Sequence, residues 1–415
     1  MSPRRLDLQI LCKSGASIER ILDSCDWGTL PLIVRFKGHP KTKSLPKNIA
    51  IALRYPDRVR EIDIGLTSTT AGPIVAAIVK TPFPTLECVR ITIKDVTGPS
   101  LLFRNVFLGG SAPCLREITL DGIGFPFLEI KQVLSSTNNL VELHLSKISE
   151  SSYFSVDTLV TALSTSVQLR RLTVGFHYPA SLPTKIKTSP PPQRTTFPSL
   201  ISLRFHGATE YIEEFVSWVD FPALRDINIM LFNMVFFEIP QFCQSIHLLN
   251  TLKSPTQVIV QLSATFVGVY ITQDGRHVPY GHCFLGTSCS RLDWQLSFAT
   301  YILTQFSHLL SSVRSLVINT RHDLSGSLTG EEDVDSTQWL ELFQPFTHAK
   351  EFRAFEQLVP GIVQALVAED ADTGVLPQLT QLSLEGYRKS SAAVEAVEQF
   401  VAARRLSGRT IHLSN

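Results

Sequence analysis

The amino-acid sequence predicts an α/β protein built as a horseshoe-shaped solenoid, with parallel strands on the concave face and helices on the convex face. Three observations predict this class. A short apolar motif recurs at intervals of about 25–30 residues, stretches with helical periodicity separate its copies, and mostly polar residues stand between the repeated apolar ones. One strand and one helix of this length cannot bury both of their apolar faces, whereas stacked units can.

The repeated motif is an apolar residue, two variable residues, a second apolar residue, one variable residue and a third apolar residue. Its first copy is Val59-Arg-Glu-Ile62-Asp-Ile64, where alternation of apolar and polar residues favours a strand. Further copies begin at Leu86, Leu115, Leu140, Leu169, Leu200, Leu224, Val313, Ala349 and Leu379. In the long gap after Leu224, the strand-like stretches Val258–Phe266 and Leu292–Phe298 are expected to supply missing units.

Helical periodicity fills the intervals between the motif copies. Apolar residues at i and i+3 or i+4 predict helices with one buried stripe. The clearest stretches are Ile74–Val79, Val156–Leu163, Ile212–Val219, Ile302–Leu310 and Val394–Val401. A doubly wound α/β domain also alternates strands and helices, but its strands are apolar on both faces. The polar residues inside the motif, such as Glu117 and Thr119, favour a sheet with one exposed face.

Charge and cysteine content exclude several classes of protein. Lys and Arg number 38 and Asp and Glu 37, so the net charge is only +1. No overall field attracts a phosphate backbone or an anionic membrane, and we expect neither nucleic acid nor membrane as a partner. Seven cysteines at irregular spacing, with no C-x-x-C pair, favour reduced thiols over a disulfide framework.

The N-terminal residues do not resemble a signal peptide, because Asp7 and Lys13 interrupt the apolar run after Arg5. The uncharged stretch Ser254–Gln273 has the length of a membrane span, but its alternation and β-branched residues favour a strand. We therefore expect an intracellular protein, cytoplasmic or nuclear, without a transmembrane helix.

The predicted domain organisation is a capping segment at 1–58 followed by one solenoid at 59–415. Its units are expected to be irregular at about 236–300, and loops are expected at about 178–196 and 322–336. The first loop is rich in proline and contains Ser189-Pro190, a candidate phosphate acceptor. A helix near Ala392–Arg405 and a strand at Thr410–Leu413 are expected to close the array, because terminal units need a polar outer face.

The motif copies resemble irregular leucine-rich repeats, as in Leu115-Arg-Glu-Ile118-Thr-Leu120 and Leu140-Val-Glu-Leu143-His-Leu145. The chain as a whole resembles fungal, basidiomycete-type F-box-like proteins that carry such repeats. In that family a segment similar to Lys13–Ala16 and Leu30–Phe36 leads into the first repeat. The resemblance implies a non-catalytic protein-binding module that serves as the substrate-recognition part of a ubiquitin ligase adaptor.

The F-box itself is not visible in this sequence. That motif resembles a Leu-Pro start followed by a helical bundle, whereas a β-rich segment follows Leu30-Pro31. Ubiquitin ligase components are therefore expected as partners only if a longer product carries an F-box. A structural scaffold without a link to a ligase is an alternative.

Candidate catalytic and metal-binding residues are few. His282, Cys283 and Cys289 could form one corner of a metal site, but a second pair of ligands is lacking. Neither a nucleophile elbow nor a phosphate-binding glycine loop occurs. We expect no catalytic, cofactor-binding or metal-binding residues. The alternative is an enzyme with a pocket in region 236–300 that His277, His282 and Cys283 line.

The concave face is the predicted partner-binding surface. Pleating sends alternate strand residues to opposite faces, so the residues between the motif's apolar positions face outward. Charges of both signs among them suit a protein partner, because opposite patches fix register. The predicted partner-binding residues are Glu61, Asp63, Arg90, Glu117, Thr119, Glu142, His144, Arg171, Thr173, Arg204 and Asn228.

Overall fold

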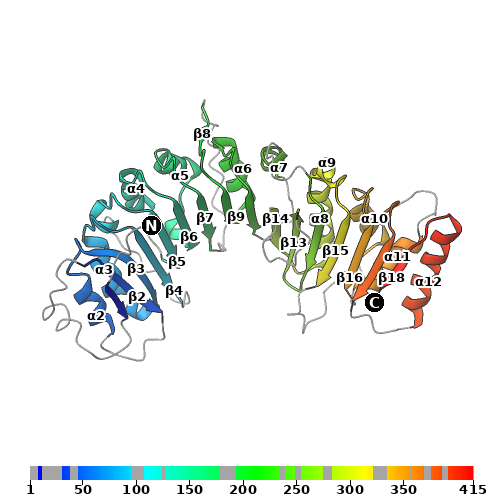
Figure 1. Ribbon diagram of the computed structural model, residues 1–415, viewed down its shortest axis with the longest axis horizontal. Helices are drawn as coiled ribbons and strands as arrows, with labels where there is room; N and C mark the ends of the chain where they lie inside the picture. Colours follow the sequence, from blue (N-terminus) through cyan, green and yellow to red (C-terminus); the bar gives the residue numbers. More distant parts are fainter. Residues whose placement is uncertain are drawn as a thin grey trace, which may run out of the picture. The chain divides into compact units, whose positions relative to one another are not determined.

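The computed structural model describes residues 8–11, 30–37, 45–94, 107–123, 127–177, 193–232, 239–247, 254–273, 283–320, 334–355, 358–368, 375–385 and 391–414. The chain divides into two compact units, Met1–Ala223 (unit 1) and Leu224–Asn415 (unit 2). Each unit contains a mostly parallel sheet together with helices (Figure 1), so the predicted α/β class is confirmed.

The strands of unit 1 follow one another in the sheet in the same order as in the chain, and all neighbours in this sheet are parallel. They are β1 (Leu8–Leu11), β2 (Leu32–Lys37), β3 (Val59–Leu66), β4 (Cys88–Ile93), β5 (Glu117–Asp121), β6 (Glu142–Ile148), β7 (Arg171–Phe176) and β9 (Ser202–Gly207). A separate parallel pair joins β8 (Thr195–Thr196) to β10 (Val219–Asp220). The predicted capping segment thus contributes β1 and β2 to the same sheet as β3.

The helices of unit 1 lie along one side of its sheet (Figure 1). They are α2 (Leu45–Ala52), α3 (Ser68–Lys80), α4 (Phe127–Ser136), α5 (Val156–Leu163) and α6 (Thr209–Trp218), with the short 3₁₀ turns η1 (Phe107–Gly110) and η2 (Glu150–Ser152). The motif's apolar residues form the core beneath them. Leu86, Val89 and Ile91 are completely buried, and Leu143 is 1% exposed. Burial therefore alternates along β4, β5 and β6, as a sheet with one covered face requires.

The turn η1 lies between β4 and β5 in the chain, and it contacts both α3 and α4. Leu108 and Gly109 have φ values of 53° and 57°, in the left-handed region. A Cβ atom on Gly109 would lie 2.8 Å from the backbone nitrogen of Pro82. Glycine at this position therefore allows both the backbone conformation and the close approach of the preceding turn.

Unit 2 has a different strand order, β11-β14-β13-β12-β15-β16-β17-β18. The bounds are β11 (Asp226–Leu231), β12 (Gln257–Leu262), β13 (Phe266–Thr272), β14 (Cys283–Ser288), β15 (Ser315–Thr320), β16 (Glu351–Phe355), β17 (Gln381–Glu385) and β18 (His412–Ser414). Strand β13 is antiparallel to both β12 and β14, whereas the other paired neighbours are parallel. We call β12, β13 and β14 the meander.

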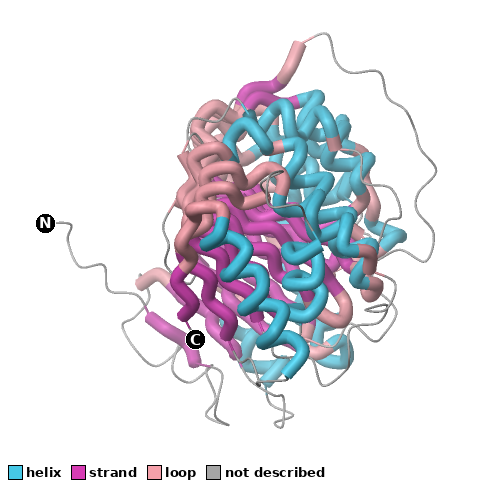
Figure 2. The backbone as a smooth tube through the Cα atoms, turned by 90° about the vertical axis from the view of Figure 1, so that its right-hand side faces the viewer, coloured by secondary structure: helices cyan, strands magenta, loops and turns pink. Residues whose placement is uncertain are grey.

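The helices of unit 2 also lie along one side of its sheet (Figure 2). They are α7 (Pro240–His247), α8 (Leu292–Gln305), α9 (Ser307–Leu310), α10 (Ser336–Phe343), α11 (Val359–Ala368) and α12 (Ser391–Leu406). Helix α8 packs against the meander and against α10. The last helix and β18 confirm the closing helix and strand that the sequence predicts.

The strand predicted at Leu292–Phe298 is wrong, because this stretch begins helix α8. Leu292, Trp294, Leu296 and Phe298 stand at every second position, which is the spacing expected of a strand. The buried residues continue through Ala299 and Ile302 at helical spacing, and this longer pattern decides the structure. The stretch Val258–Phe266 is also not a single strand.

The chain reverses direction at Ser263, between β12 and β13. The hydroxyl of Ser263 accepts hydrogen bonds from the backbone N–H groups of Thr265 at 3.3 Å and Phe266 at 3.0 Å. Such a side-chain-supported turn joins antiparallel neighbours, whereas a parallel connection needs a dozen or more residues. The short connection therefore fixes the direction of β13.

The two predicted loops lie mostly outside the described residues, including Ser189-Pro190. Of the first loop, Thr195 and Thr196 form β8, and Arg194 forms an ion pair with Asp220 at 3.2 Å. Of the second, Asp335 caps helix α10 by accepting a hydrogen bond from the Thr337 N–H at 3.3 Å.

Candidate functional site

The open face of unit 1 is the side of its sheet that the helices do not cover. The residues that form it are Arg35, Glu61, Asp63, Cys88, Arg90, Glu117, Thr119, Glu142, His144, Arg171, Thr173, Ser202, Arg204 and His206. In-register parallel pairing arranges most of them in two rows that cross the strands. Polar side chains from strands distant in sequence thus become neighbours.

One row joins Asp63, Arg90, Thr119, His144, Thr173 and Arg204, and the other joins Glu61, Cys88, Glu117, Glu142, Arg171 and Ser202. Every residue predicted for the partner-binding surface lies in these rows except Asn228. That residue belongs to unit 2, where it pairs in register with Phe284 of β14. The role of the rows in partner binding stays a prediction.

Charges on β2 to β5 form an ion-pair ladder that consists of Arg35, Glu61, Asp63, Arg90 and Glu117. The guanidinium of Arg35 donates to both carboxylate oxygens of Glu61 at 2.9 Å. Arg90 donates to both oxygens of Glu117, and its Nη1 lies 3.4 Å from Glu61. Asp63 is only 7% exposed, and its Oδ2 lies 3.9 Å from Arg90 Nη1. Two cations hold three carboxylates, so this part of the face is paired internally.

The end of the open face farthest from the ladder, on β7 and β9, is basic. Arg171 forms an ion pair with Glu142, and its side chain is 55% exposed. Arg204 and His206 of β9 and His177, which follows β7, are also exposed. We call Arg171, His177, Arg204 and His206 the basic end of the open face. The Arg171 side chain is more exposed than that of Arg90, which is 36% exposed.

His144 lies between the ladder and the basic end. Its Nε2 lies 2.5 Å from the hydroxyl oxygen of Ser146. Burial lowers the pKa of His144, the Asp121 carboxylate raises it, and Arg204 lowers it. Burial and the neighbouring His177 likewise lower the pKa of His206. Both imidazoles therefore favour the neutral form.

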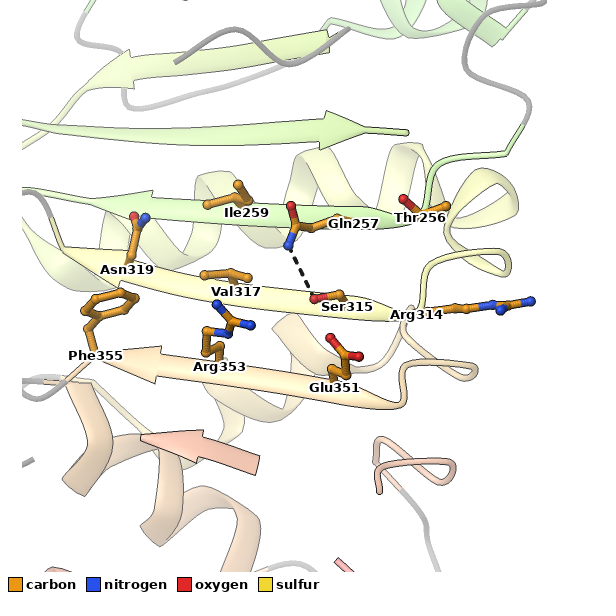
Figure 3. A pocket seen from close by; sticks show the side chains of 10 residues that line it. All are labelled: Thr256, Gln257, Ile259, Arg314, Ser315, Val317, Asn319, Glu351, Arg353 and Phe355. Carbon is orange, nitrogen blue, oxygen red and sulfur yellow. Dashed lines mark hydrogen bonds between the residues drawn. The ribbon is translucent and has the colours of Figure 1, made fainter. Parts of the chain in front are cut away.

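A hollow of about 320 Å³ lies on the open face of unit 2, across β12, β15 and β16 (Figure 3). Its lining residues are Thr256, Gln257, Ile259, Arg314, Ser315, Val317, Asn319, Glu351, Arg353 and Phe355. In-register pairing places Gln257 beside Ser315, and Ile259 beside Val317. Gln257 Nε2 donates to Ser315 Oγ at 3.4 Å.

Sequence reasoning missed this hollow, although a signal was present. Val317 occupies a motif position where the other repeats carry polar residues, and it is 7% exposed although it faces away from the helices. Ile259 of β12 is the neighbouring apolar residue on the same face. Two apolar residues at outward positions of paired strands indicate a covered or recessed surface.

Cys283 and Cys289, the cysteines considered as metal ligands, are both buried. Cys283 lies in β14 and is completely buried, and burial raises the pKa of its thiol. Burial and Glu117 raise the pKa of Cys88 to about 12. Such thiols are protonated near neutral pH, and the thiolate is the reactive form. His277 and His282 lie outside the described residues, so a pocket of His277, His282 and Cys283 stays a prediction.

Within the described part of the chain, no three His, Cys, Asp or Glu side chains are grouped closely enough to hold a metal ion. Among the helices that the structure describes, none combines the length and the apolar character needed to cross a membrane. No protein-family model matches the sequence, and a search of curated proteins finds no match.

Proposed function

We propose that this chain is a leucine-rich-repeat solenoid whose function is to bind another protein on its open face. The in-order parallel strands of unit 1, the helices on one side of each sheet and a motif of about 25–30 residues per repeat support the architecture. The observation that carries the proposed function is the alignment of polar side chains from β3 to β9 in two rows on an uncovered face.

The ion-pair ladder and the basic end have different roles in this proposal. Side chains that already pair with one another, such as Arg90 and Glu117, are held in place and lose little freedom on binding. The exposed cations Arg171 and Arg204 provide the attraction, so the partner contributes an acidic segment there. Complementary charge of this kind increases the rate of association and selects among partners.

The experiment compares partners that the purified chain captures from extract, quantified by mass spectrometry, with those of the double variant Arg171→Glu/Arg204→Glu. We expect the specific partner to fall at least about tenfold, because like charges meet across the interface. The matched control is Lys80→Glu/Lys131→Glu, which reverses two cations on α3 and α4 of the same unit. Equal recovery with both variants, with circular dichroism unchanged, contradicts the proposed binding face.

We propose further, on the resemblance to F-box-like proteins, that the bound protein is a substrate for ubiquitin transfer. The supporting test is whether ubiquitin ligase scaffold components co-purify with the full-length gene product. A partner captured through the open face without any ligase component would favour the alternative, a scaffold without a ligase link.

A further inference from the structure

We propose that the hollow of unit 2 binds one aromatic side chain that carries a hydrogen-bond donor, tyrosine or tryptophan, from an extended segment of a protein partner. The inference rests on the proposed protein-binding function, but it concerns a different surface and a defined ligand chemistry. Strands β12, β15 and β16 supply the hollow, and none of the residues predicted for the partner-binding surface lines it.

The floor of the hollow is apolar and suits a flat ring. Ile259 and Val317 are register neighbours on β12 and β15, and Arg353 is the register neighbour of Val317 on β16. Figure 3 shows the Arg353 side chain extending toward Val317, and the Phe355 ring near Asn319. A ring on this floor contacts aliphatic carbons, a guanidinium and another ring, and each of these contacts is favourable for an aromatic group.

An unsatisfied acceptor at one end selects among ligands. Asn319 Oδ1 is buried and has no hydrogen-bond partner among the described residues. Its register neighbour Gln261 accepts a hydrogen bond from the Tyr270 hydroxyl at 3.0 Å through Oε1. A rotation of the Asn319 amide toward the hollow would let a ligand donor reach its oxygen. Leaving such an acceptor unpaired costs free energy, so a ligand with a donor binds more tightly.

The volume and charge of the hollow exclude most other side chains. About 320 Å³ is at the lower limit for ligand pockets, which fits one side chain with its flanking backbone. Phenylalanine, leucine and methionine have no donor for Asn319. Lysine and arginine have donors but would add a cation to a hollow that two arginines, Arg314 and Arg353, and only one carboxylate, Glu351, already line. Tyrosine and tryptophan combine a neutral donor with a large apolar body, and both are enriched at the centres of interfaces.

The test measures dissociation constants by ligand-observed NMR for N-acetyl-tyrosinamide, N-acetyl-tryptophanamide and N-acetyl-phenylalaninamide with the full chain. We expect the first two to bind about three- to tenfold more tightly than the third, the range of one hydrogen bond. Asn319→Leu should remove this difference while the phenylalanine amide still binds. Ser315→Trp should fill the hollow and abolish binding of all three probes.

The matched control is Ser383→Trp, which adds the same ring on the neighbouring strand β17, where Ser383 pairs with Arg353. We expect it to retain at least half of the probe affinity. Equal affinity for the three amides, binding that survives Ser315→Trp, or no binding at all would overturn the proposal. Binding of p-cresol without the amides would also overturn it, because the hollow would then take a free small molecule.

The unit 1 variant Arg171→Glu/Arg204→Glu separates this inference from the proposed function. Its probe binding should be unchanged, since its substitutions lie on another surface. If captured partners are lost while the probes still bind, the result supports both the proposed function and the inference about the hollow. If the probes fail to bind while partner capture still depends on Arg171 and Arg204, only the inference about the hollow fails.

Discussion

The sheets of the two units use the same helix-covered arrangement but differ in strand direction and in the chemistry of the open face. Unit 1 is parallel in chain order, and ion pairs such as Arg35–Glu61 cross its strands. Unit 2 contains the antiparallel meander, and part of its open face is apolar. In the meander, Phe284 lies 4.5 Å from Tyr270 between ring centroids, and Phe284 is 5% exposed.

The glycines of the meander explain why its open face is apolar. Gly268 and Gly286 are paired on β13 and β14. A Cβ atom added to Gly268 would lie 2.5 Å from the Phe284 ring. The ring therefore packs directly over a backbone without side chains. The comparison teaches that repeated strand–helix units align polar side chains in rows, whereas a hairpin insertion replaces them with packed rings.

The largest expected effects are at matched core leucines of the two sheets. Leu143 of β6 and Leu285 of β14 are each 1% exposed. We expect Leu143→Ala and Leu285→Ala each to lower the free energy of unfolding by about 2–5 kcal/mol, because each leaves a cavity. Urea denaturation measures both.

Leu413→Ala on β18 is the control, because Leu413 is 47% exposed and its loss should cost less than about 0.5 kcal/mol. A similarly small loss for Leu285→Ala alone would mean that the meander is not part of the core of unit 2.

The next prediction concerns the buried amide that holds the meander to α8. Gln295 is completely buried, and its Nε2 donates to Ser263 O at 2.7 Å and to Cys289 O at 2.6 Å. Gln295→Met should lower the free energy of unfolding by about 1–3 kcal/mol, because two carbonyl groups lose their donor. Thr304→Met, at an exposed position of the same helix, should change it by less than about 0.5 kcal/mol. Equal effects would show that the two hydrogen bonds do not fix the turn.

A smaller effect distinguishes the ladder from the basic end within unit 1. Arg90→Met should cost about 1–2 kcal/mol in the free energy of unfolding, because three carboxylates lose their shared cation. Arg171→Met removes one exposed pair and should cost less than about 1 kcal/mol. Denaturation at low and high salt checks both, since salt screens the exposed pair more strongly. The reverse order of costs would contradict the internal pairing of the ladder.

The smallest expected effect is a pH dependence that His144 confers on unit 1. Its pKa is lower in the folded state than the ordinary 6.5, mainly because of burial. Below that pH the unfolded chain binds a proton that the folded chain does not, so stability falls as the pH decreases until folded His144 is protonated. His144→Asn should flatten this fall in urea denaturation below about pH 6.5. An unchanged slope would assign the pH dependence to other groups.

The sequence predicts the regular part of this protein well and the meander poorly. At Leu115, Ile118 and Leu120, the motif spacing determines which residues are buried, and parallel stacking then determines the rows. The strand Cys283–Ser288 carries no such signal, because five of its six residues are buried and no polar residue alternates with them.

For the site, the sequence places the rows correctly but not the pairing within them. Whether Glu61 faces solvent or Arg35 depends on rotamers and on the neighbouring strand, which lies 26 positions away in the chain. The hollow forms because β12 pairs with β15, a strand that follows the meander in the chain. Local periodicity in the sequence does not predict this pairing. An apolar residue at an outward position, such as Val317, is the only sign of this pairing that the sequence offers for the hollow.

The meander also obeys a rule of parity. Because β12, β13 and β14 alternate in direction, the outer two point the same way, and each is parallel to the strand beyond it, β11 on one side and β15 on the other. An odd number of hairpin-linked strands therefore interrupts a parallel sheet without reversing the polarity of the later strands. An even number would make every later strand antiparallel to the strands before the meander. The helix that follows each later strand would then start from the opposite edge of the sheet. Chains of this kind can thus gain or lose such segments only in steps that conserve direction.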